Sequence, residues 1–126
     1  TTDTGDQMWS AVATFKAAAA GSSDMTLVSD DFTAESAPST ALVMCLLEEV
    51  DSVTLNTDLK GYVSRDGGTT YTQTTLVDTG SYDGTRKIIR GTGDISAQPR
   101  GTTMKYKCET LNATDMKIHM ASVGWD

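Results

Sequence analysis

Few side chains in this 126-residue sequence could carry out acid–base or nucleophilic chemistry. The single histidine, His119, lies in a strand-like stretch, where we predict a structural role, and no second histidine is available to activate a serine. Carboxylates are adjacent at Glu48-Glu49 and at Asp30-Asp31, but neighbouring strand residues point to opposite faces, so neither pair converges as a glycosidase dyad must. We therefore predict no catalytic residues and no enzyme activity.

Metal and cofactor sites are equally weakly indicated. The aspartates Asp58, Asp66 and Asp83 lie in predicted loops and could offer oxygen ligands to calcium, but their spacing is not that of an EF-hand loop. The Gly91-x-Gly93 pattern lacks the strand-to-helix context of a phosphate-binding loop. We expect neither a metal nor a cofactor.

Two cysteines, Cys45 and Cys108, lie far apart in the sequence on predicted strands. A disulfide between facing sheets would need the two strands to oppose each other. Both cysteines are flanked by apolar residues, which favours buried free thiols.

The clearest local motif lies in the stretch 59–77, LKGYVSRDGGTTYTQTTLV, which predicts two strands around a tight turn. A carboxylate followed by two glycines suits such a turn, because the carboxylate accepts backbone N–H groups and the glycines tolerate positive φ. The pattern resembles the Asp-box of sialidase-like propellers, but only one copy is present, so we interpret it as a structural hairpin. The predicted hairpin residues are Ser64, Asp66, Gly67, Gly68, Thr70 and Tyr71.

Composition and charge narrow the class of protein. The formal net charge is −7 and the pI is about 4.5, which disfavours direct binding to nucleic acid, since phosphates require a basic patch. Threonine, glycine and serine are frequent and aromatic residues are sparse, a balance typical of strands and turns. No apolar run is long enough to cross a bilayer, so we expect no membrane association.

The pattern from residue 25 onward predicts an all-β domain. Strands are expected at 25–29, 41–47, 53–56, 59–64, 86–90, 103–111 and 117–125, with loops at 78–85 and 91–102. In the 103–111 strand, Met104, Tyr106 and Cys108 alternate with Lys105, Lys107 and Glu109. Seven or eight strands at this spacing predict an antiparallel β-sandwich of jelly-roll-like type over residues 25–126.

One predicted strand, ALVMCLL at 41–47, is apolar on both faces. Such a strand must be covered on both sides, either by a second sheet and the N-terminal segment or by another copy of the protein. The three side chains Leu42, Met44 and Leu46 are therefore candidate partner contacts.

The N-terminal residues 1–24 differ in composition from the rest. Trp9, Val12 and Phe15 are spaced three apart among alanines, which fits a short amphipathic helix that ends at Gly21. The alternative is an extended arm that docks Trp9 and Phe15 into a neighbouring subunit. Both interpretations stay open, and both make Trp9 and Phe15 candidate partner contacts.

Several stretches together resemble a β-domain that recurs in structural proteins of tailed bacteriophages, including small virion proteins and the ends of tail-fibre-like chains. The resemblance spans residues 25–126 and is strongest in LNTDLKGYVSRDGGTTY and DISAQPRGTTMKYKCETLN. It implies a virion structural module with a β-sandwich and transfers no catalytic motif. The two cysteines are not part of the pattern that carries the resemblance, and the N-terminal segment lies outside it.

The resemblance leads to two expectations about function. The first is a capsid decoration or cement protein on the surface of the virion, with the major capsid protein as partner and with self-association, for example as a trimer. The second is a tail-fibre or receptor-binding domain, in which Tyr82 and Trp125 would stack on sugar rings of host-surface glycans.

Overall fold

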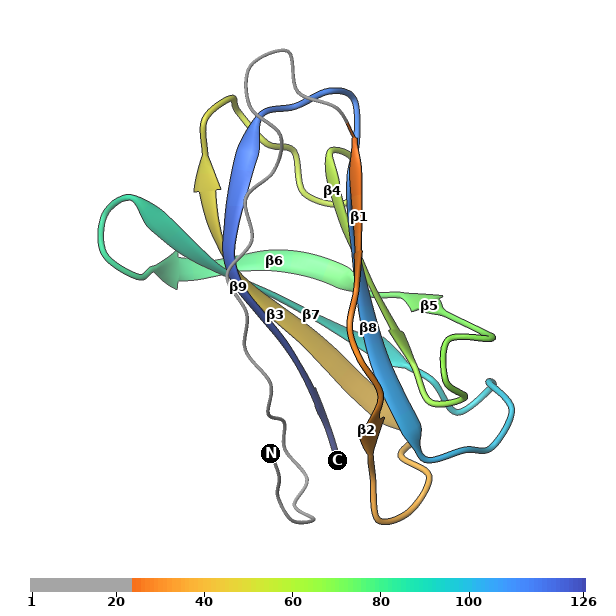
Figure 1. Ribbon diagram of the computed structural model, residues 1–126. Helices are drawn as coiled ribbons and strands as arrows, with labels where there is room; N and C mark the ends of the chain where they lie inside the picture. Colours follow the sequence, from red (N-terminus) through yellow and green to blue (C-terminus); the bar gives the residue numbers. More distant parts are fainter. Residues whose placement is uncertain (1–23) are drawn as a thin grey trace.

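A computed structural model of the protein describes residues 24–126, which form two packed antiparallel β-sheets (Figure 1). The predicted all-β sandwich is therefore confirmed. Within this part of the chain no helix is long and apolar enough to cross a membrane. The expectation of an N-terminal helix or arm falls on residues outside the described part.

The first sheet contains five strands. Its order is β1-β8-β4-β5, and β2 pairs with the far end of β8. The bounds are β1 Met25–Val28, β2 Phe32–Thr33, β4 Leu59–Ser64, β5 Thr72–Gln73 and β8 Thr103–Thr110.

The second sheet contains four longer strands in the order β6-β7-β3-β9. Their bounds are β3 Thr40–Glu49, β6 Thr75–Ser81, β7 Arg86–Asp94 and β9 Met116–Trp125. β3 is a central strand that pairs with β7 on one side and β9 on the other, whereas β9 is an edge strand.

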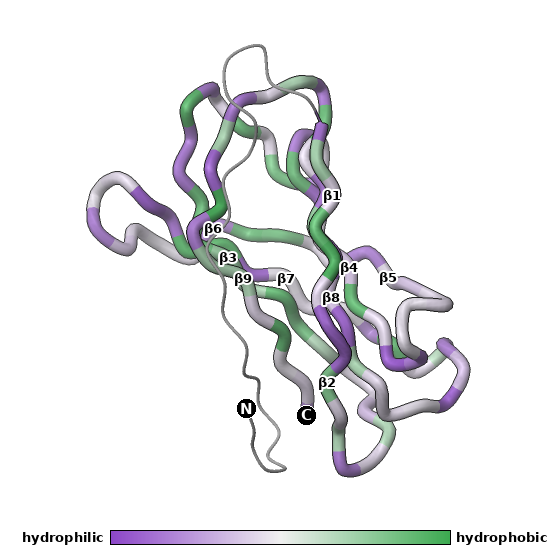
Figure 2. Tube along the Cα trace, viewed as in Figure 1, coloured by the Kyte–Doolittle hydropathy of each residue, from purple (hydrophilic) through white to green (hydrophobic). Residues whose placement is uncertain are grey.

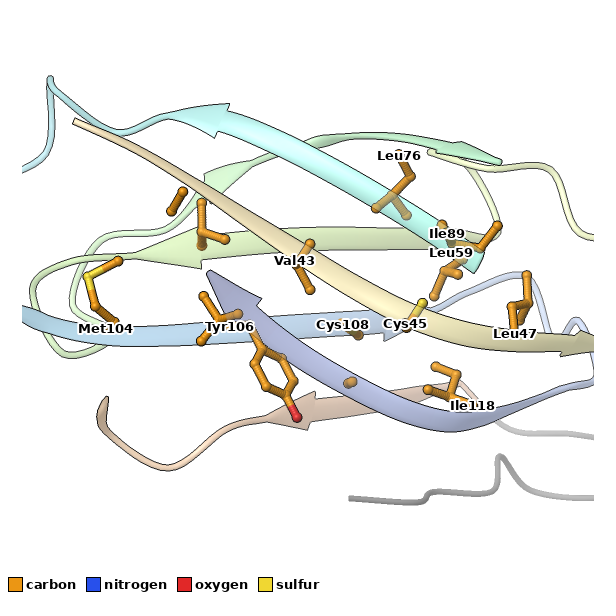
Figure 3. Close-up of a cluster of buried hydrophobic side chains, with 14 of the residues drawn as sticks. Val43, Cys45, Leu47, Leu59, Leu76, Ile89, Met104, Tyr106, Cys108 and Ile118 are labelled. Carbon is orange, nitrogen blue, oxygen red and sulfur yellow. The ribbon is translucent and has the colours of Figure 1, made fainter. Parts of the chain in front are cut away.

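The core lies between the sheets and is built mainly from alternate residues of β3, β4, β8 and β9, with Leu76 of β6 and Ile89 of β7 (Figure 3). In β8, Met104, Tyr106 and Cys108 are buried in it and the intervening lysines are not, as the alternation predicted. Figure 2 shows hydrophobic stretches along the strands and hydrophilic residues in connections such as the β6–β7 loop. An interior of this kind gains about 25 cal/mol for each Å² of apolar surface that it removes from water.

The threonine-rich run after the hairpin turn was predicted to form one strand. Instead it forms two strands, β5 and β6, and passes from the first sheet to the second. Thr74 lies between β5 and β6, and its hydroxyl donates to the carbonyl of Gly61 at 3.0 Å. Its side chain fills the space above Gly91, where a Cβ atom would stand 2.4 Å from the Thr74 Oγ1. Glycine is therefore required inside β7, at a point where the two sheets come close together.

Three further boundaries differ from the prediction. Residues 53–56 form no strand and contribute only an isolated bridge from Leu55 to Leu59. β7 continues to Asp94 and β6 to Ser81, both in stretches predicted as loops. Glu48 and Glu49 are the half-buried last two residues of β3, whereas the predicted strand ended at residue 47.

A buried arginine holds one end of the sandwich together. Arg65 is 6% exposed and donates to four backbone carbonyls: those of Pro38 at 2.8 Å, Ser96 at 3.1 Å, Pro99 at 3.2 Å and Gln98. These acceptors lie in the connections β2–β3 and β7–β8, each of which joins the two sheets. The carbonyl oxygens thus accept hydrogen bonds from the guanidinium N–H groups, and their dipoles stabilise its buried positive charge.

The side chain of Gln98 completes this arrangement. Its Oε1 accepts the backbone N–H of Arg65 at 2.8 Å, and its Nε2 donates to the carbonyl of Val63 at 3.0 Å and to the hydroxyl of Thr72 at 2.9 Å. Gln98 is itself only 5% exposed. The hairpin strands β4 and β5 are therefore tied directly to the β7–β8 connection.

We expect Arg65→Met to lower the free energy of unfolding by about 3 kcal/mol, because four carbonyls would lose their donor and two of them, those of Pro38 and Gln98, are buried. Arg100→Met is the matched control in the same connection, since Arg100 is exposed, and it should change stability by less than about 0.5 kcal/mol. Urea unfolding followed by circular dichroism measures both. Equal midpoints for the two variants would contradict this account of Arg65.

Candidate binding surface

The predicted hairpin residues form a closed network of hydrogen bonds in the β4–β5 turn. The Oδ1 of Asp66 accepts from the Ser64 hydroxyl at 2.7 Å and from the Thr70 N–H at 2.8 Å. The Ser64 oxygen in turn accepts the N–H of Gly68 at 3.0 Å. Gly67 and Gly68 have φ values of 73° and 90°, a region that glycine enters without strain.

Tyr71 follows this turn and belongs to a polar–aromatic cluster on the outer face of the first sheet. Its ring meets that of Tyr62 edge to face, with centroids 6.4 Å apart. The ammonium group of Lys107 lies 4.5 Å from the Tyr71 centroid and 4.6 Å from that of Tyr62, and the Tyr62 hydroxyl donates to Glu109 at 3.0 Å. Because the lysine already occupies both rings, the cluster stabilises the sheet surface and offers no open aromatic platform.

Two opposing effects act on the pKa of Asp66. Desolvation by burial raises it, but the hydrogen bonds from Thr70 and Ser64 together outweigh this, so the pKa lies below its ordinary value. The carboxylate therefore stabilises the folded state above the pKa that it has in the unfolded chain, and this contribution disappears as the pH falls through the folded pKa.

We expect Asp66→Asn to be less stable than the parent protein at pH 7, and the difference between the two to shrink as the pH falls toward 2. The reason is that the parent loses the charged acceptor on protonation, whereas the amide has no charge to lose. Urea midpoints measured across this range give the difference directly. A stability difference that does not change with pH would show that the charge of Asp66 does not contribute.

The two cysteines are free and buried, as the flanking residues predicted. Cys45 comes from β3 and Cys108 from β8, so they enter the core from opposite sheets (Figure 3). Burial raises the pKa of Cys108 to about 12, and burial together with the proximity of Cys108 raises that of Cys45. Neither thiol is poised as a nucleophile, since the reactive species is the thiolate.

We expect no stoichiometric reaction of the folded protein with a thiol reagent such as dithionitrobenzoate at pH 8. With a pKa of about 12, only about one Cys108 thiol in ten thousand is ionised at that pH. Both cysteines should react once the protein is unfolded in urea, which serves as the control. Rapid modification of either cysteine in the native protein would contradict the buried positions.

His119 has an acidic partner in the structure. It is the extra residue of a bulge in β9, where the register with β3 shifts, and its Nε2 lies 2.7 Å from the Oε1 of Glu48. This hydrogen bond is the main cause of the lowered pKa of Glu48, with a smaller contribution from Lys117. None of the hydrogen bonds of residues 24–126 joins His119 to a hydroxyl or thiol, so the pair is not part of a nucleophilic triad.

The aspartates considered as calcium ligands lie in separate loops. Asp58 accepts from the Thr54 N–H at 2.9 Å and from Asn112 at 2.8 Å, and Asp83 accepts from two N–H groups of its own loop. Asp66 serves the hairpin turn. Among residues 24–126 there is no group of three or more acidic, histidine or cysteine side chains that could hold a metal ion.

The apolar candidates of β3 lie together on the outer face of the second sheet. Ala41, Val43, Cys45 and Leu47 belong to the core, so the alternate residues Leu42, Met44 and Leu46 point away from it. Strand pairing extends them into three rows across the sheet. The rows are Thr75-Thr92-Leu42-Gly124, Val77-Arg90-Met44-Ser122 and Ile88-Leu46-Met120.

This surface, which we call the outer face, combines apolar side chains with one charge. Val77 is 50% exposed at its edge, and Arg90 is exposed next to Met44. Arginine and methionine are enriched in protein interfaces, and an arginine surrounded by apolar groups is a common anchor. The composition of the outer face is therefore that of a contact surface.

A groove of about 580 Å³ opens at one end of the outer face. It lies over the start of β3 and the end of β9, where Gly124 leaves space beside Leu42. Its further lining includes Met44, Trp125 and Asp126, so apolar and polar groups both face it. A Cβ atom at Gly124 would stand 3.6 Å from the Leu42 side chain, which is ordinary van der Waals contact, so a small side chain could be accommodated there.

The structure therefore brings together three of the five predicted contact residues. Leu42 and Met44 line the groove, and Leu46 lies in the next row. Trp9 and Phe15 lie outside the described residues. Gly124 was missed as part of this surface, because only the pairing of β9 with β3 places it beside Leu42. Trp125 also lines the groove, but it pairs with Ala41 and its side chain packs against the core.

Comparison with known proteins gives no match to a protein-family model, to a curated protein or to a solved structure.

Proposed function

We propose that the protein is a structural component of a tailed-bacteriophage virion, a capsid decoration or cement protein that binds the outer surface of the major capsid shell. The observation that carries the proposal is the outer face of the second sheet, in which β3 presents the half-buried Leu42 and Met44 away from the core, next to Leu46, which is only 8% exposed. The resemblance of residues 25–126 to β-domains of phage structural proteins supports the same role.

The outer face suits a protein that adds contacts to a shell. A decoration protein strengthens a capsid by burying surface across the seams between subunits, so that expansion must break additional contacts. Standard interfaces bury about 800 Å² on each partner, and many copies multiply a modest contribution from each. The apolar rows would supply the buried centre of this contact, and Arg90 would meet an acidic or carbonyl group of the shell.

We expect Met44→Asp to weaken binding to purified capsids by about tenfold or more, since it places a charge in the centre of the outer face. Val28→Asp is the matched control, because Val28 is 51% exposed on β1 of the other sheet. Co-sedimentation with capsids that lack the protein measures binding, and circular dichroism checks that both variants fold. Equal binding by the two variants would exclude the outer face as the contact.

The functional readout is the resistance of the capsid to heat and to osmotic shock. Capsids without the protein should disrupt at a lower temperature or a smaller osmotic shock than decorated capsids, and added protein should restore resistance. Identical resistance with and without the protein would overturn the cement role.

The groove supports a second candidate, a tail-fibre or receptor-binding domain that contacts host-surface glycans. Trp125 lines the groove together with Thr40 and Asp126, which is the combination of aromatic and polar groups that sugar recognition uses. Tyr82, also considered for this role, is 59% exposed in the β6–β7 loop and is not part of the groove lining.

The number of copies in each particle separates the two candidates. Hundreds of copies, counted by quantitative mass spectrometry of intact virions, would fit a shell protein, and a few to a few dozen would fit a tail. Self-association, including a trimer, would be expected to use the same outer face and is measured by sedimentation.

A further inference from the structure

The β6–β7 hairpin extends beyond the body of the sandwich. Arg86, at the start of β7, pairs with Glu48 near the end of β3, so residues 82–85 lie past the end of the neighbouring strand. Figure 1 shows the hairpin projecting to the left, away from both sheets, and residues 77–85 are all exposed. The hairpin therefore presents its turn to any molecule that approaches this end of the second sheet.

The turn of this hairpin, residues 81–85, which we call the tip, has a hydrogen-bonded backbone and one large side chain. The N–H of Tyr82 donates to the carbonyl of Arg86 at 2.7 Å. The Oδ1 of Asp83 accepts the N–H groups of Thr85 and Arg86 at 3.1 and 2.9 Å. Tyr82 is 59% exposed. A preformed turn loses little conformational entropy on binding, and tyrosine is a frequent anchor in interfaces, so the tip is suited to insertion into a partner.

The groove lies at the opposite end of the same sheet. It opens beside Leu42, whereas the tip follows the row of Glu48, which is roughly 20 Å farther along β3. The hairpin points away from the groove, so the tip cannot enter the groove of its own molecule (Figure 1). A tip and a groove at opposite ends of one sheet can instead form a head-to-tail contact between two copies.

We propose that the tip of one copy docks in the groove of a second copy, with the Tyr82 ring against Leu42 and the Asp83 carboxylate beside Arg90. The groove has a volume of about 580 Å³, which admits a tyrosine ring together with adjoining residues of the tip. Its lining combines apolar side chains with a few polar groups, as is usual in binding pockets.

Charge favours an acidic tip as the occupant. Arg90 is exposed in the lining, and none of the ion pairs among residues 24–126 includes it. The Oδ2 of Asp83 lies 3.8 Å from Arg86 of its own hairpin, but such an exposed pair is weak and leaves the carboxylate free to meet Arg90. The other charged group of the lining, Asp126, lies at the far end of the groove, where its Oδ1 accepts the N–H of Thr40 at 3.4 Å.

The contact should be weak in solution. A hairpin tip buries less surface than a standard interface, and the net charge of −7 makes two copies repel each other. The protein should therefore be a monomer with an open groove in dilute solution and should associate only when copies are concentrated. The inference goes beyond the proposed function, because it concerns contact between copies in the absence of a shell.

Two variants with complementary defects test the proposal without any capsid. Tyr82→Ser removes the anchor and keeps the groove, whereas Arg90→Glu alters the groove and keeps the tip. Both positions are exposed, so both proteins should fold. When unlabelled Arg90→Glu protein is added to concentrated, isotope-labelled Tyr82→Ser protein, NMR shifts should appear at amides that line the groove, such as those of Leu42 and Thr92. With the labels exchanged, shifts should appear at residues 81–85.

Matched controls separate the specific contact from a change in net charge. Unlabelled protein that carries both Tyr82→Ser and Arg90→Glu lacks the anchor and should cause no shifts. Labelled protein with the same two substitutions lacks the intact groove and should show none. Labelled protein with Tyr82→Ser and Arg100→Glu has the same net charge and should still respond, because Arg100 is exposed outside the groove lining.

Three results would overturn the proposal. The first is a mixture of the two single variants that shows no shifts in the groove, which would leave the groove for a partner other than a second copy. The second is a set of groove shifts that persists when the labelled protein carries Arg90→Glu. The third is a concentration-dependent shift of groove amides in Tyr82→Ser protein alone, which would indicate contact between two grooves. None of these measurements involves a capsid, so failure here and failure of the proposed function are distinguishable.

Discussion

The register of β3 sets both the interior and the surface of this molecule. Its odd-numbered residues from Ala41 to Leu47 fill the space between the sheets, and the even-numbered residues between them form the centre of the outer face. A shift of one residue would exchange the two sets. Pairing with β7 on one side and β9 on the other prevents this shift, and the bulge at His119 absorbs the only irregularity between β3 and β9.

The parts of the fold that follow from local pattern were predictable from the sequence. Three of these patterns are contained within a few consecutive residues. They are the alternation along β8, the two-sided apolar run of β3 and the turn residues around Asp66. The error in β7 has a different origin. Gly91 resembles a loop glycine in the sequence, but it is needed because Thr74 crosses between the sheets directly above it. Such a close approach between distant segments leaves no local signal.

The candidate surface was predicted only in part for the same reason. Leu42, Met44 and Leu46 could be assigned to one face because strand periodicity is local. The groove depends on the pairing of Gly124 with Leu42, and these two residues lie far apart in the sequence. The network around Arg65 is equally non-local, because its acceptors come from two separate connections, and an arginine in a polar turn predicts exposure instead.

The central claim is that the outer face is covered when the protein is in its assembly, and methionine oxidation measures this most directly. Met44 lies in the groove, whereas Met104 and Met116 are fully buried in the core and serve as internal references. Mild peroxide treatment, followed by peptide mass spectrometry, should oxidise Met44 in the isolated protein several times faster than in intact particles. Equal rates of Met44 oxidation in the two samples would contradict the account.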